Sequence, residues 1–380
     1  MSDTPSDQFD VLVIGAGIAG ASVAFELAAD ARVAVLEMES QPGYHTTGRS
    51  AAVFSELYGP APIRALTGYS RGFFENPPDV FGREPLLTPR GVLYIARSDQ
   101  RDSLSTFAGA MVGKPGVRSL DAHSVEQTLP LLRSGHAIGG VFETGARDID
   151  VNGLHQGFLR GFRQRSGRVI TSAQVTGLAR KAGSWSVSTR NGEFSAPVVV
   201  NAAGAWADAI AVMAGVRKID LVPKRRTALI VAAPADSDPQ AWPVAIDVDE
   251  QFYMKPDAGR LLISPADETP SPPCDAQPEE IDIAICIERI QEAFDIEVRR
   301  VENAWAGLRS FVEDHAPICG FDADAAGFFW LAGQGGYGIQ SSPGLSRVAA
   351  RLVRGEKVPE ALEALGFSAE QVSPERLPRR

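Results

Sequence analysis

The apolar positions near the N-terminus form one continuous run and then a helical repeat. Residues 9–14 read FDVLVI, which is typical of a buried strand, and apolar residues then recur with helical spacing until a second apolar run, ARVAVLE, ends at Glu37. Three glycines separate the first run from the helical repeat: Gly15, Gly17 and Gly20. The pattern predicts a strand, a tight turn, a helix and a second strand within residues 9–39.

Two later segments show the same change from strand to small residues to helix. Residues 196–211 read APVVVNAAGAWADAIA, and residues 327–355 read GFFWLAGQGGYGIQSSPGLSRVAARLVRG. Each segment alone is compatible with an ordinary connection between a strand and a helix. Together with the N-terminal pattern, they favour loops that approach an anion or a flat ring closely.

A third type of pattern lies between these segments. LVPKRRTALIVAAP, QFYMKP and RLLISPA are short β-type runs separated by Pro, Asp and Gly. Residues 265–282 are rich in proline and acidic residues, which predicts an exposed loop leading to a helix that begins near Pro278 or Glu279.

Composition excludes several classes of protein. The 380 residues are 44% hydrophobic and 22% charged, so the chain buries one large core or two smaller ones and is not a disordered protein. The 37 basic and 47 acidic residues give a net charge of −10, which disfavours nucleic acid as a partner. Because the three cysteines lack C-x-x-C spacing, we expect neither a disulfide framework nor a zinc site: Cys274, Cys286 and Cys319.

The sequence patterns indicate neither an export signal nor a membrane-spanning helix. The N-terminus reads MSDTPSDQ, with no export signal, and no apolar run reaches the roughly 18 residues of a membrane-spanning helix. Together with the cysteine usage, this predicts a cytoplasmic protein without a transmembrane segment, and peripheral attachment to the inner membrane stays open.

The three glycines and Glu37 match the dinucleotide fingerprint G-x-G-x-x-G. Gly15 permits the tight turn, Gly17 lets the backbone approach a pyrophosphate, and Gly20 allows the helix to pack closely on the strand. The helix N-terminus supplies N–H groups to the phosphates. Since the ribose position is the acidic Glu37, the pattern favours FAD or NAD over NADP.

Eight motifs, in this order, resemble the D-amino-acid-oxidase superfamily of FAD-dependent oxidoreductases and, within it, the bacterial D-arginine dehydrogenases: PGYHTTGRSAA, LLTPR, HQGFLRG, VNAAGAWADAIA, PKRR, FYMKPDAG, WAGLRSF and FFWLAGQGGYGIQ. The resemblance covers residues 9–377. It implies FAD as the cofactor. Sarcosine-oxidase relatives attach the flavin to a cysteine shortly after the arginine of the WAGLRSF-like segment, whereas Ser310 follows Arg309 here, so we expect non-covalent FAD.

The resemblance also implies a two-domain α/β architecture assembled from discontinuous segments. A Rossmann-like FAD domain is expected from residues 1–86, 147–220 and 306–366. A second, mainly antiparallel β substrate domain is expected from residues 87–146 and 221–305. The short β-type runs described above agree with the second assignment.

Individual FAD contacts follow from the resemblance, position by position. They are Gly15, Ala16, Gly17, Ile18, Ala19 and Gly20 in the fingerprint, Glu37 and Met38 after the second strand, Thr47, Gly48, Arg49, Ser50, Ala51 and Ala52 in the next loop, Val175, Ala203, Gly204 and Trp206 in the middle of the chain, and Gly335, Gly336, Tyr337, Gly338, Ile339 and Gln340 near the C-terminus.

Five positions are expected to hold the substrate. Arg309 offers a two-pronged donor for a carboxylate, and the resemblance adds Tyr253 and Arg226 to the carboxylate site. It places Tyr58 on a mobile loop that shields the substrate, and it makes the Gly336 carbonyl an acceptor for the substrate amine. The alternatives are a surface ion pair for Arg309, a core position for Tyr253 and a solvated basic turn for Arg226.

Histidines and metals have no expected role in the chemistry. Because the histidines lack a metal-ligand spacing, no metal is proposed. His45 is expected near the cofactor, and the remaining histidines are expected to be structural or surface residues: His123, His136, His155 and His315.

This chain departs from the D-arginine dehydrogenases at two pocket positions. An acidic residue and a histidine of that group correspond to Val92 and Val53 here. A buried guanidinium without its carboxylate loses about a few kcal/mol, so arginine is expected to be a poor substrate. An apolar or aromatic D-amino acid is favoured, and broad specificity for D-amino acids stays open. Glu84 supplies a compensating charge if its loop folds inward.

The expected reaction is oxidative deamination of a D-amino acid, by hydride transfer from Cα to flavin N5, to a 2-oxo acid and ammonia. The alternatives are the same scaffold acting on a 2-hydroxy acid or an N-methyl amino acid, and a flavoprotein that binds its ligand without turnover. The expected partners are a small-molecule amino acid and an electron acceptor. Residue types do not identify that acceptor as a quinone, as oxygen or as another oxidant.

Overall fold

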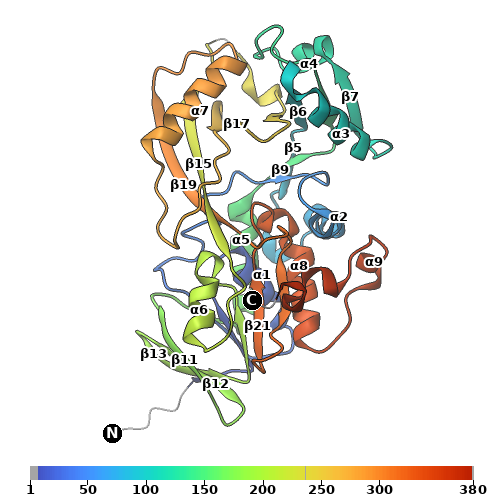
Figure 1. Cartoon of the computed structure of the whole chain (residues 1–380). Helices are drawn as coiled ribbons and strands as arrows, with labels where there is room; N and C mark the ends of the chain where they lie inside the picture. Colours follow the sequence, from blue (N-terminus) through green and yellow to red (C-terminus); the bar gives the residue numbers. More distant parts are fainter. Residues whose placement is uncertain (1–6, 236, 379–380) are drawn as a thin grey trace.

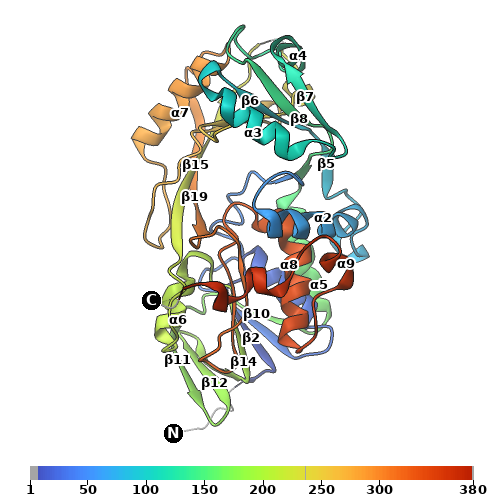
Figure 2. The ribbon, with the colours of Figure 1, turned by 45° about the vertical axis from the view of Figure 1, so that its right-hand side comes forward.

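The computed structural model describes residues 7–235 and 237–378, which form two regions (Figure 1). The lower region in Figure 1 holds the N-terminal strands and most of the helices, and the upper region holds a large sheet with α7, α3 and α4. Two long strands, β15 (Val222–Ala232) and β19 (Val301–Phe311), pass from one region into the other in both views (Figures 1 and 2).

The lower sheet joins segments from the start, middle and end of the chain. Its order is β10–β3–β2–β14–β21–β20, parallel except for β20 against β21. The strands are β10 Arg168–Ile170, β3 Val33–Leu36, β2 Val11–Ile14, β14 Val198–Asn201, β21 Phe328–Ala332 and β20 Ile318–Phe321. Because β2, β14 and β21 run parallel side by side, their carboxyl ends meet at one edge, together with the small-residue loops that follow them.

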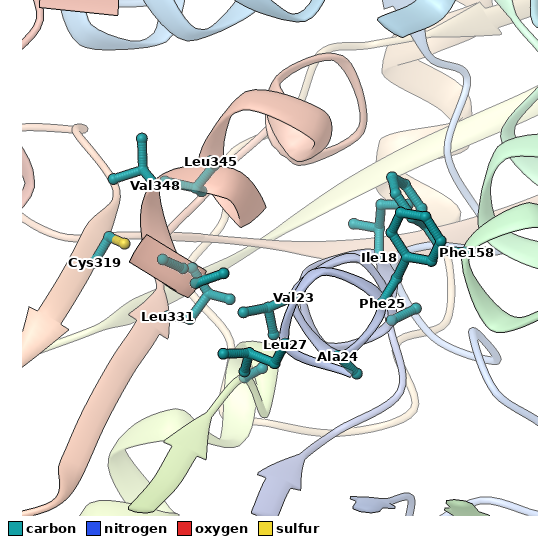
Figure 3. Close-up of a cluster of buried hydrophobic side chains, with 14 of the residues drawn as sticks. Ile18, Val23, Ala24, Phe25, Leu27, Phe158, Cys319, Leu331, Leu345 and Val348 are labelled. Atoms are coloured by element: carbon teal, nitrogen blue, oxygen red, sulfur yellow. The ribbon is translucent and has the colours of Figure 1, made fainter. Parts of the chain in front are cut away.

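Helices cover one face of the lower sheet, with α1 (Ile18–Leu27) in their centre. Figure 3 shows Phe25 of α1 beside Phe158 on one side and Val23 and Leu27 toward Leu331 on the other. Buried on both sides, α1 is apolar almost throughout. Its neighbours are α5 Val151–Gln164 and α8 Gly338–Val353. α2 Ala61–Glu75 packs on α8, with the short α9 Glu360–Glu363 beside α2.

The opposite face of the lower sheet packs on α6 (Ala207–Met213) and on a small sheet. That sheet has the order β1–β13–β12–β11, with the strands β1 Asp7–Gln8, β13 Gly192–Ala196, β12 Ser184–Thr189 and β11 Val175–Lys181. The strands, turns and helices predicted for residues 9–39, 196–211 and 327–355 are all confirmed.

The upper sheet has the order β19–β15–β18–β17–β16–β6–β8–β7 and is antiparallel except for β16 against β6. Besides β15 and β19, it contains β18 Arg260–Ser264, β17 Tyr253–Asp257, β16 Val244–Asp247, β6 Val92–Ala96, β8 Gly139–Glu143 and β7 Val117–Asp121. One face packs on α7 (Glu280–Ala293) and α4 (Ala122–Thr128), and α3 (Arg101–Met111) covers part of the other. The helix expected near Pro278 or Glu279 is α7, whose N-cap is Glu279.

A short sheet lies between the two regions. It has the order β4–β9–β5, with β4 Val53–Phe54, β9 Arg147–Ile149 and β5 Leu87–Pro89. Short 3₁₀ turns complete the elements: η1 Asp79–Phe81, η2 Ser98–Gln100, η3 Gly204–Trp206, η4 Pro239–Ala241, η5 Ala369–Val372 and η6 Pro374–Arg376.

The expected fold class, a Rossmann-like α/β region with a mainly antiparallel second region, is confirmed. The domain boundaries stay a proposal. The strands of the upper sheet come from residues 92–143 and 222–311, so the boundary proposed at residue 306 falls inside β19. Within residues 7–235 and 237–378, no helix combines the length and the apolar character needed to cross a bilayer.

Candidate active site

A cavity of about 310 Å³ runs between the lower sheet and the upper sheet. Its walls are the loops after β2, β14 and β21, the loop of residues 43–58, and the upper sheet. The part of the upper sheet that lines the cavity lies on the same face as α3, beyond the area that α3 covers. One end therefore lies at the glycine fingerprint, which we call the cofactor end. The other lies at Arg309, which we call the substrate end.

Backbone packing at the cofactor end requires glycine at two fingerprint positions. Gly15 has φ +97°, and a Cβ there would lie 2.6 Å from the carbonyl oxygen of Ala202. A Cβ at Gly20 would lie 1.8 Å from the carbonyl oxygen of Gly15. Both glycines thus serve the tight turn and the close helix packing that the fingerprint predicts.

Side chains around the fingerprint hold its loop in place. Thr47 Oγ1 accepts a hydrogen bond from Ile18 N at 2.9 Å, at the start of α1. The buried Glu37 carboxylate accepts from Ala16 N at 2.7 Å and from Glu39 N at 2.9 Å, and it also lines the cavity. A carboxylate fixed at the end of β3 beside the glycine turn suits a ribose that has a free 2′-hydroxyl.

His155 lies behind this end of the cavity and has a structural role, which is one of the two roles expected from the sequence. It is buried on α5, and its Nε2 donates to the carbonyl oxygen of Ala16 at 2.8 Å. Burial lowers the pKa of His155, with the bond to Ala16 opposing the shift. His45, the one histidine expected near the cofactor, lines the cavity, where its Nε2 lies 3.0 Å from Glu39 Oε1.

Most expected FAD contacts line the cavity. These are Gly15, Gly17, Ile18, Ala19, Glu37, Met38, Thr47, Arg49, Ser50, Ala51, Ala52, Val175, Ala203, Gly204, Trp206, Gly335, Gly336, Gly338, Ile339 and Gln340. Four others lie behind the wall: Ala16, Gly20, Gly48 and Tyr337. Their contacts are with protein; Tyr337, for example, packs its ring edge-on against Tyr58 with centroids 4.8 Å apart.

The Arg49 guanidinium is bonded to protein groups. It donates to the carbonyl oxygens of Ala276 at 2.8 Å and Ala306 at 2.9 Å and pairs with Asp275. The Arg49 carbonyl in turn accepts from Trp305 Nε1 at 2.9 Å. The side chain therefore ties the loop after β3 to β19, a role that the sequence did not indicate.

At the substrate end, three of the expected residues meet. Arg309 Nη1 donates to the Tyr58 hydroxyl at 3.2 Å, and a Cβ on Gly336 would lie 2.8 Å from the same nitrogen. Among the described residues, no carboxylate lies within ion-pair distance of Arg309, so the surface ion pair considered as an alternative is not formed. The guanidinium is thus available to an anion in the cavity.

Electrostatic interactions favour one protonation state for Arg309 and one for Tyr58. Burial opposes the charge of Arg309, but the neighbouring Tyr58, Tyr253 and Glu250 outweigh it and raise the pKa of the guanidinium. Burial raises the pKa of Tyr58 against the opposing charge of Arg309. Arg309 is therefore a cation and Tyr58 a neutral phenol, whose own proton remains free for a ligand.

Tyr253 and Arg226 also line the cavity, but they differ in exposure and in their bonds to protein groups. Tyr253 on β17 is partly exposed to it, whereas Arg226 on β15 is buried and bonded to the Asp267 carbonyl at 2.9 Å and to Glu268 at 3.1 Å. The solvated basic turn proposed as an alternative is wrong, because Lys224, Arg225 and Arg226 are strand residues with acidic partners.

The wall near Tyr253 contains a group of apolar side chains. Val53 and Val92 line the cavity as expected, together with Val244, Ile246 and Phe252. Glu84 is exposed and is not among the lining residues, so the compensating charge considered for it is not present in the cavity.

The sequence reasoning missed several polar groups in the wall, among them Ser55, Tyr94, Glu250 and Lys255. The two-residue period of a strand would have indicated Lys255, which shares the face of Tyr253 on β17. The same period places Tyr94 beside Val92 on β6. Lys255 Nζ lies 2.9 Å from Asp148 Oδ1, a carboxylate that also accepts from Arg90 Nε at 2.7 Å. No group of His, Cys, Asp and Glu suited to a metal ion occurs within the described part of the chain.

Comparisons with known proteins agree with this geometry. The family model described as FAD dependent oxidoreductase (DAO) matches residues 10–352. The chain is 24% identical over 374 residues to the glycine oxidase of Geobacillus kaustophilus (strain HTA426), covering 95% of this chain and 96% of that protein. It is 23% identical over 265 residues to the mitochondrial dimethylglycine dehydrogenase of Homo sapiens, covering 68% of this chain but only 30% of that longer protein.

Solved structures share the fold. The crystal structure of glycine oxidase from Geobacillus kaustophilus matches with a TM-score of 0.84 at 22% identity, covering 99% of this chain and 100% of that chain. L-alpha-glycerophosphate oxidase from Mycoplasma pneumoniae, solved with FAD bound, matches with a TM-score of 0.83 at 18% identity, covering 92% and 95%. The fingerprint, the fixed Glu37 carboxylate at the position expected for the ribose, and the family match across residues 10–352 agree with one another. The chain therefore belongs to the FAD dependent oxidoreductase (DAO) family, and its cofactor is FAD.

Proposed function

We propose that this protein oxidises a D-amino acid with an apolar side chain, releasing the 2-oxo acid and ammonia. The observation that carries the proposal is Arg309, a guanidinium at the substrate end that faces the cavity without a carboxylate partner among the described residues. A side chain of this kind recognises a carboxylate through two parallel hydrogen bonds. The apolar wall formed by Val53, Val92, Val244 and Ile246 supports an apolar side chain.

The chain's own residues bind and orient the substrate. Arg309 and Tyr253 hold the carboxylate, and the Gly336 carbonyl accepts a hydrogen bond from the amine. Tyr58 donates a hydrogen bond from its phenolic O–H to the carboxylate and screens it from water. Bound FAD supplies the acceptor for the two electrons and the hydrogen removed from Cα. The amine loses one proton as the imino acid forms, and water then converts the imino acid to the 2-oxo acid and ammonia.

The cysteines bear on two further proposals, that FAD is bound non-covalently and that the protein is cytoplasmic. Cys319 is 1% exposed on β20 and does not line the cavity, and Ser310 follows Arg309, so we propose that FAD is held non-covalently. The three cysteines are free thiols, which supports a reducing cytoplasm. The final electron acceptor is proposed only as a class, either oxygen or a quinone-like oxidant.

A second candidate is oxidation of an N-methyl amino acid, because the carboxylate site does not distinguish it from a primary amine and one relative is named a dimethylglycine dehydrogenase. A 2-hydroxy acid carries the same carboxylate and is a third. The test is anaerobic reduction of the flavin by D- and L-amino acids, N-methyl amino acids and 2-hydroxy acids, followed at the flavin absorbance band. Rapid bleaching by apolar D-amino acids with release of ammonia is expected. Bleaching only by hydroxy acids or N-methyl amines contradicts the proposal, and bleaching by no amino acid at all contradicts the reaction class.

A further inference from the structure

Residues 55–58, which we call the Tyr58 segment, are held from the lower region by α8. Gln340 Oε1 accepts a hydrogen bond from Ser55 N at 3.2 Å, and Gln340 Nε2 donates to the Tyr58 carbonyl at 3.5 Å. Gln340 is buried, so these contacts replace bonds to water. One wall of the cavity thus fixes both ends of the segment.

The upper region holds the same segment through Glu143, the last residue of β8. The Ser55 hydroxyl donates to Glu143 Oε2 at 2.6 Å, and Glu56 N donates to Glu143 Oε1 at 3.0 Å. Each carboxylate oxygen therefore has one donor from the Tyr58 segment. Glu143 lies opposite Val92 in the ladder between β8 and β6, so it occupies the strand position next to the apolar pocket wall.

Keeping a carboxyl group at this place is costly to the fold. Glu143 is 6% exposed, and burial raises its pKa against the two hydrogen bonds from the Tyr58 segment. Burial and then the charge of Glu143 raise the pKa of the neighbouring Tyr94 phenol. Among the described residues, no cation lies within ion-pair distance of Glu143. The contacts that satisfy the carboxylate are those with Ser55 and Glu56.

We propose that Glu143 is a positioning residue for carboxylate recognition: through Ser55 and Glu56, it holds Tyr58 against Arg309. This inference rests on the proposed function of the substrate end. Tyr58 reaches Arg309 at 3.2 Å from a segment that is anchored three residues earlier, and its ring packs on Tyr337. Without Glu143 the segment keeps its bonds to Gln340 and the ion pair of the Glu56 side chain with Arg71. It loses the acceptor for the Ser55 hydroxyl and for Glu56 N, so the phenol is held less firmly beside the guanidinium.

The test compares Glu143→Ala and Glu143→Gln with the wild-type holoenzyme. KM and kcat are measured with the best substrate from the reduction panel. Binding of 4-methylpentanoate, a carboxylate without an amino group, is measured from the change in the flavin spectrum. For Glu143→Ala we expect KM and the Kd of 4-methylpentanoate to rise about tenfold, with a smaller change in kcat, as when one charge-assisted hydrogen bond is lost. Glu143→Gln keeps an acceptor and is expected to restore most of the affinity.

Asp208→Ala is the matched control. Asp208 on α6 is also a partly buried carboxyl whose pKa is raised by burial, and it accepts from two backbone groups, Ile219 N at 3.0 Å and Leu221 N at 2.9 Å. Its loss is expected to lower Tm without changing the Kd of 4-methylpentanoate. If Glu143→Ala lowers Tm in the same way and leaves KM and Kd unchanged, Glu143 is only a structural residue and the inference is wrong.

A double-mutant cycle with Ser55→Ala tests the route through the segment. If Glu143 acts through Ser55, the double variant binds 4-methylpentanoate about as weakly as Glu143→Ala alone. Fully additive losses contradict the inference. The two proposals fail separately: if no amino acid reduces the wild-type flavin, the proposed reaction is wrong, whereas unchanged binding in Glu143→Ala with an active wild type contradicts only the role of Glu143.

Discussion

The two ends of the cavity differ in how their polar groups are satisfied. At the cofactor end, Glu37, Thr47 and His155 all bond to the backbone of the fingerprint and its neighbours, so groups of the protein itself hold the loop in place. At the substrate end, the Arg309 guanidinium has only the Tyr58 hydroxyl as a hydrogen-bond partner within the described residues. The difference indicates that the first end is built for a permanently bound molecule, and the second for one that enters and leaves in each catalytic cycle.

The largest effect is expected at the unpaired cation. Arg309→Ala should lower kcat/KM about 100- to 1000-fold, because a buried substrate carboxylate loses its charged partner. Arg309→Lys keeps the charge but not the two-pronged geometry and should recover only part of the loss. Steady-state kinetics check this, and flavin content serves as the control. An Arg309→Ala enzyme with normal kcat/KM would show that the carboxylate binds elsewhere.

The next effect concerns the cofactor end. Gly15→Ala is expected to weaken FAD binding about 100-fold, because a Cβ at φ +97° is strained and would overlap the Ala202 carbonyl. Flavin retained after dialysis measures the effect. Gly72→Ala is the matched control, since a Cβ there meets nothing within 4 Å and should leave the flavin bound. Equal flavin retention in both variants would contradict the requirement for glycine in the tight turn at residue 15.

A smaller change is expected for the tyrosine of the substrate end. Tyr253→Phe removes one hydroxyl from the cavity wall and should raise KM about tenfold, as expected for one hydrogen bond to a charged group. Tyr44→Phe is the comparison, because that hydroxyl lies near Asp275 at 3.3 Å, away from Arg309. If both variants have the wild-type KM, Tyr253 contributes packing and not a carboxylate contact.

The smallest effect is a pH dependence of stability at His155. Its folded-state pKa is lowered by burial, so the unfolded chain binds more protons below its usual pKa of about 6.5. The stability contribution is therefore fully present above about pH 6.5 and is lost as the pH falls below it. His155→Gln should flatten this acid-side slope in denaturant titrations, whereas replacement of the exposed His123 should not. A wild-type slope in His155→Gln would rule the residue out as its source.

The same contrast explains how much the sequence predicted. The cofactor end depends on local patterns: a strand, glycines at fixed spacing and an acid at the end of the next strand, all within residues 9–39. Arg309, Tyr253, Tyr58 and Gly336 were found by resemblance, and the structure brings them to one end of the cavity. The partners of Arg226 lie at residues 267 and 268, and those of Glu143 at residues 55 and 56. Pairings this distant along the chain follow from sheet order, which no local period encodes.

The long strands β15 and β19 have a mechanical consequence. Their ladder is paired from Val222 with Phe311 to Val231 with Val301, and it carries Arg226 and Arg309 inside it. A hydrogen-bonded ribbon of this length, in register except for one irregularity between Ile230 and Val231, resists stretching and shear within its plane, so the two regions it joins are expected to behave as one stiff frame. Opening by a wide hinge would have to bend that ribbon and would displace Arg309 in each cycle. We therefore expect substrate to enter by a local movement of the loop that carries Tyr58, without a change in the arrangement of the two regions.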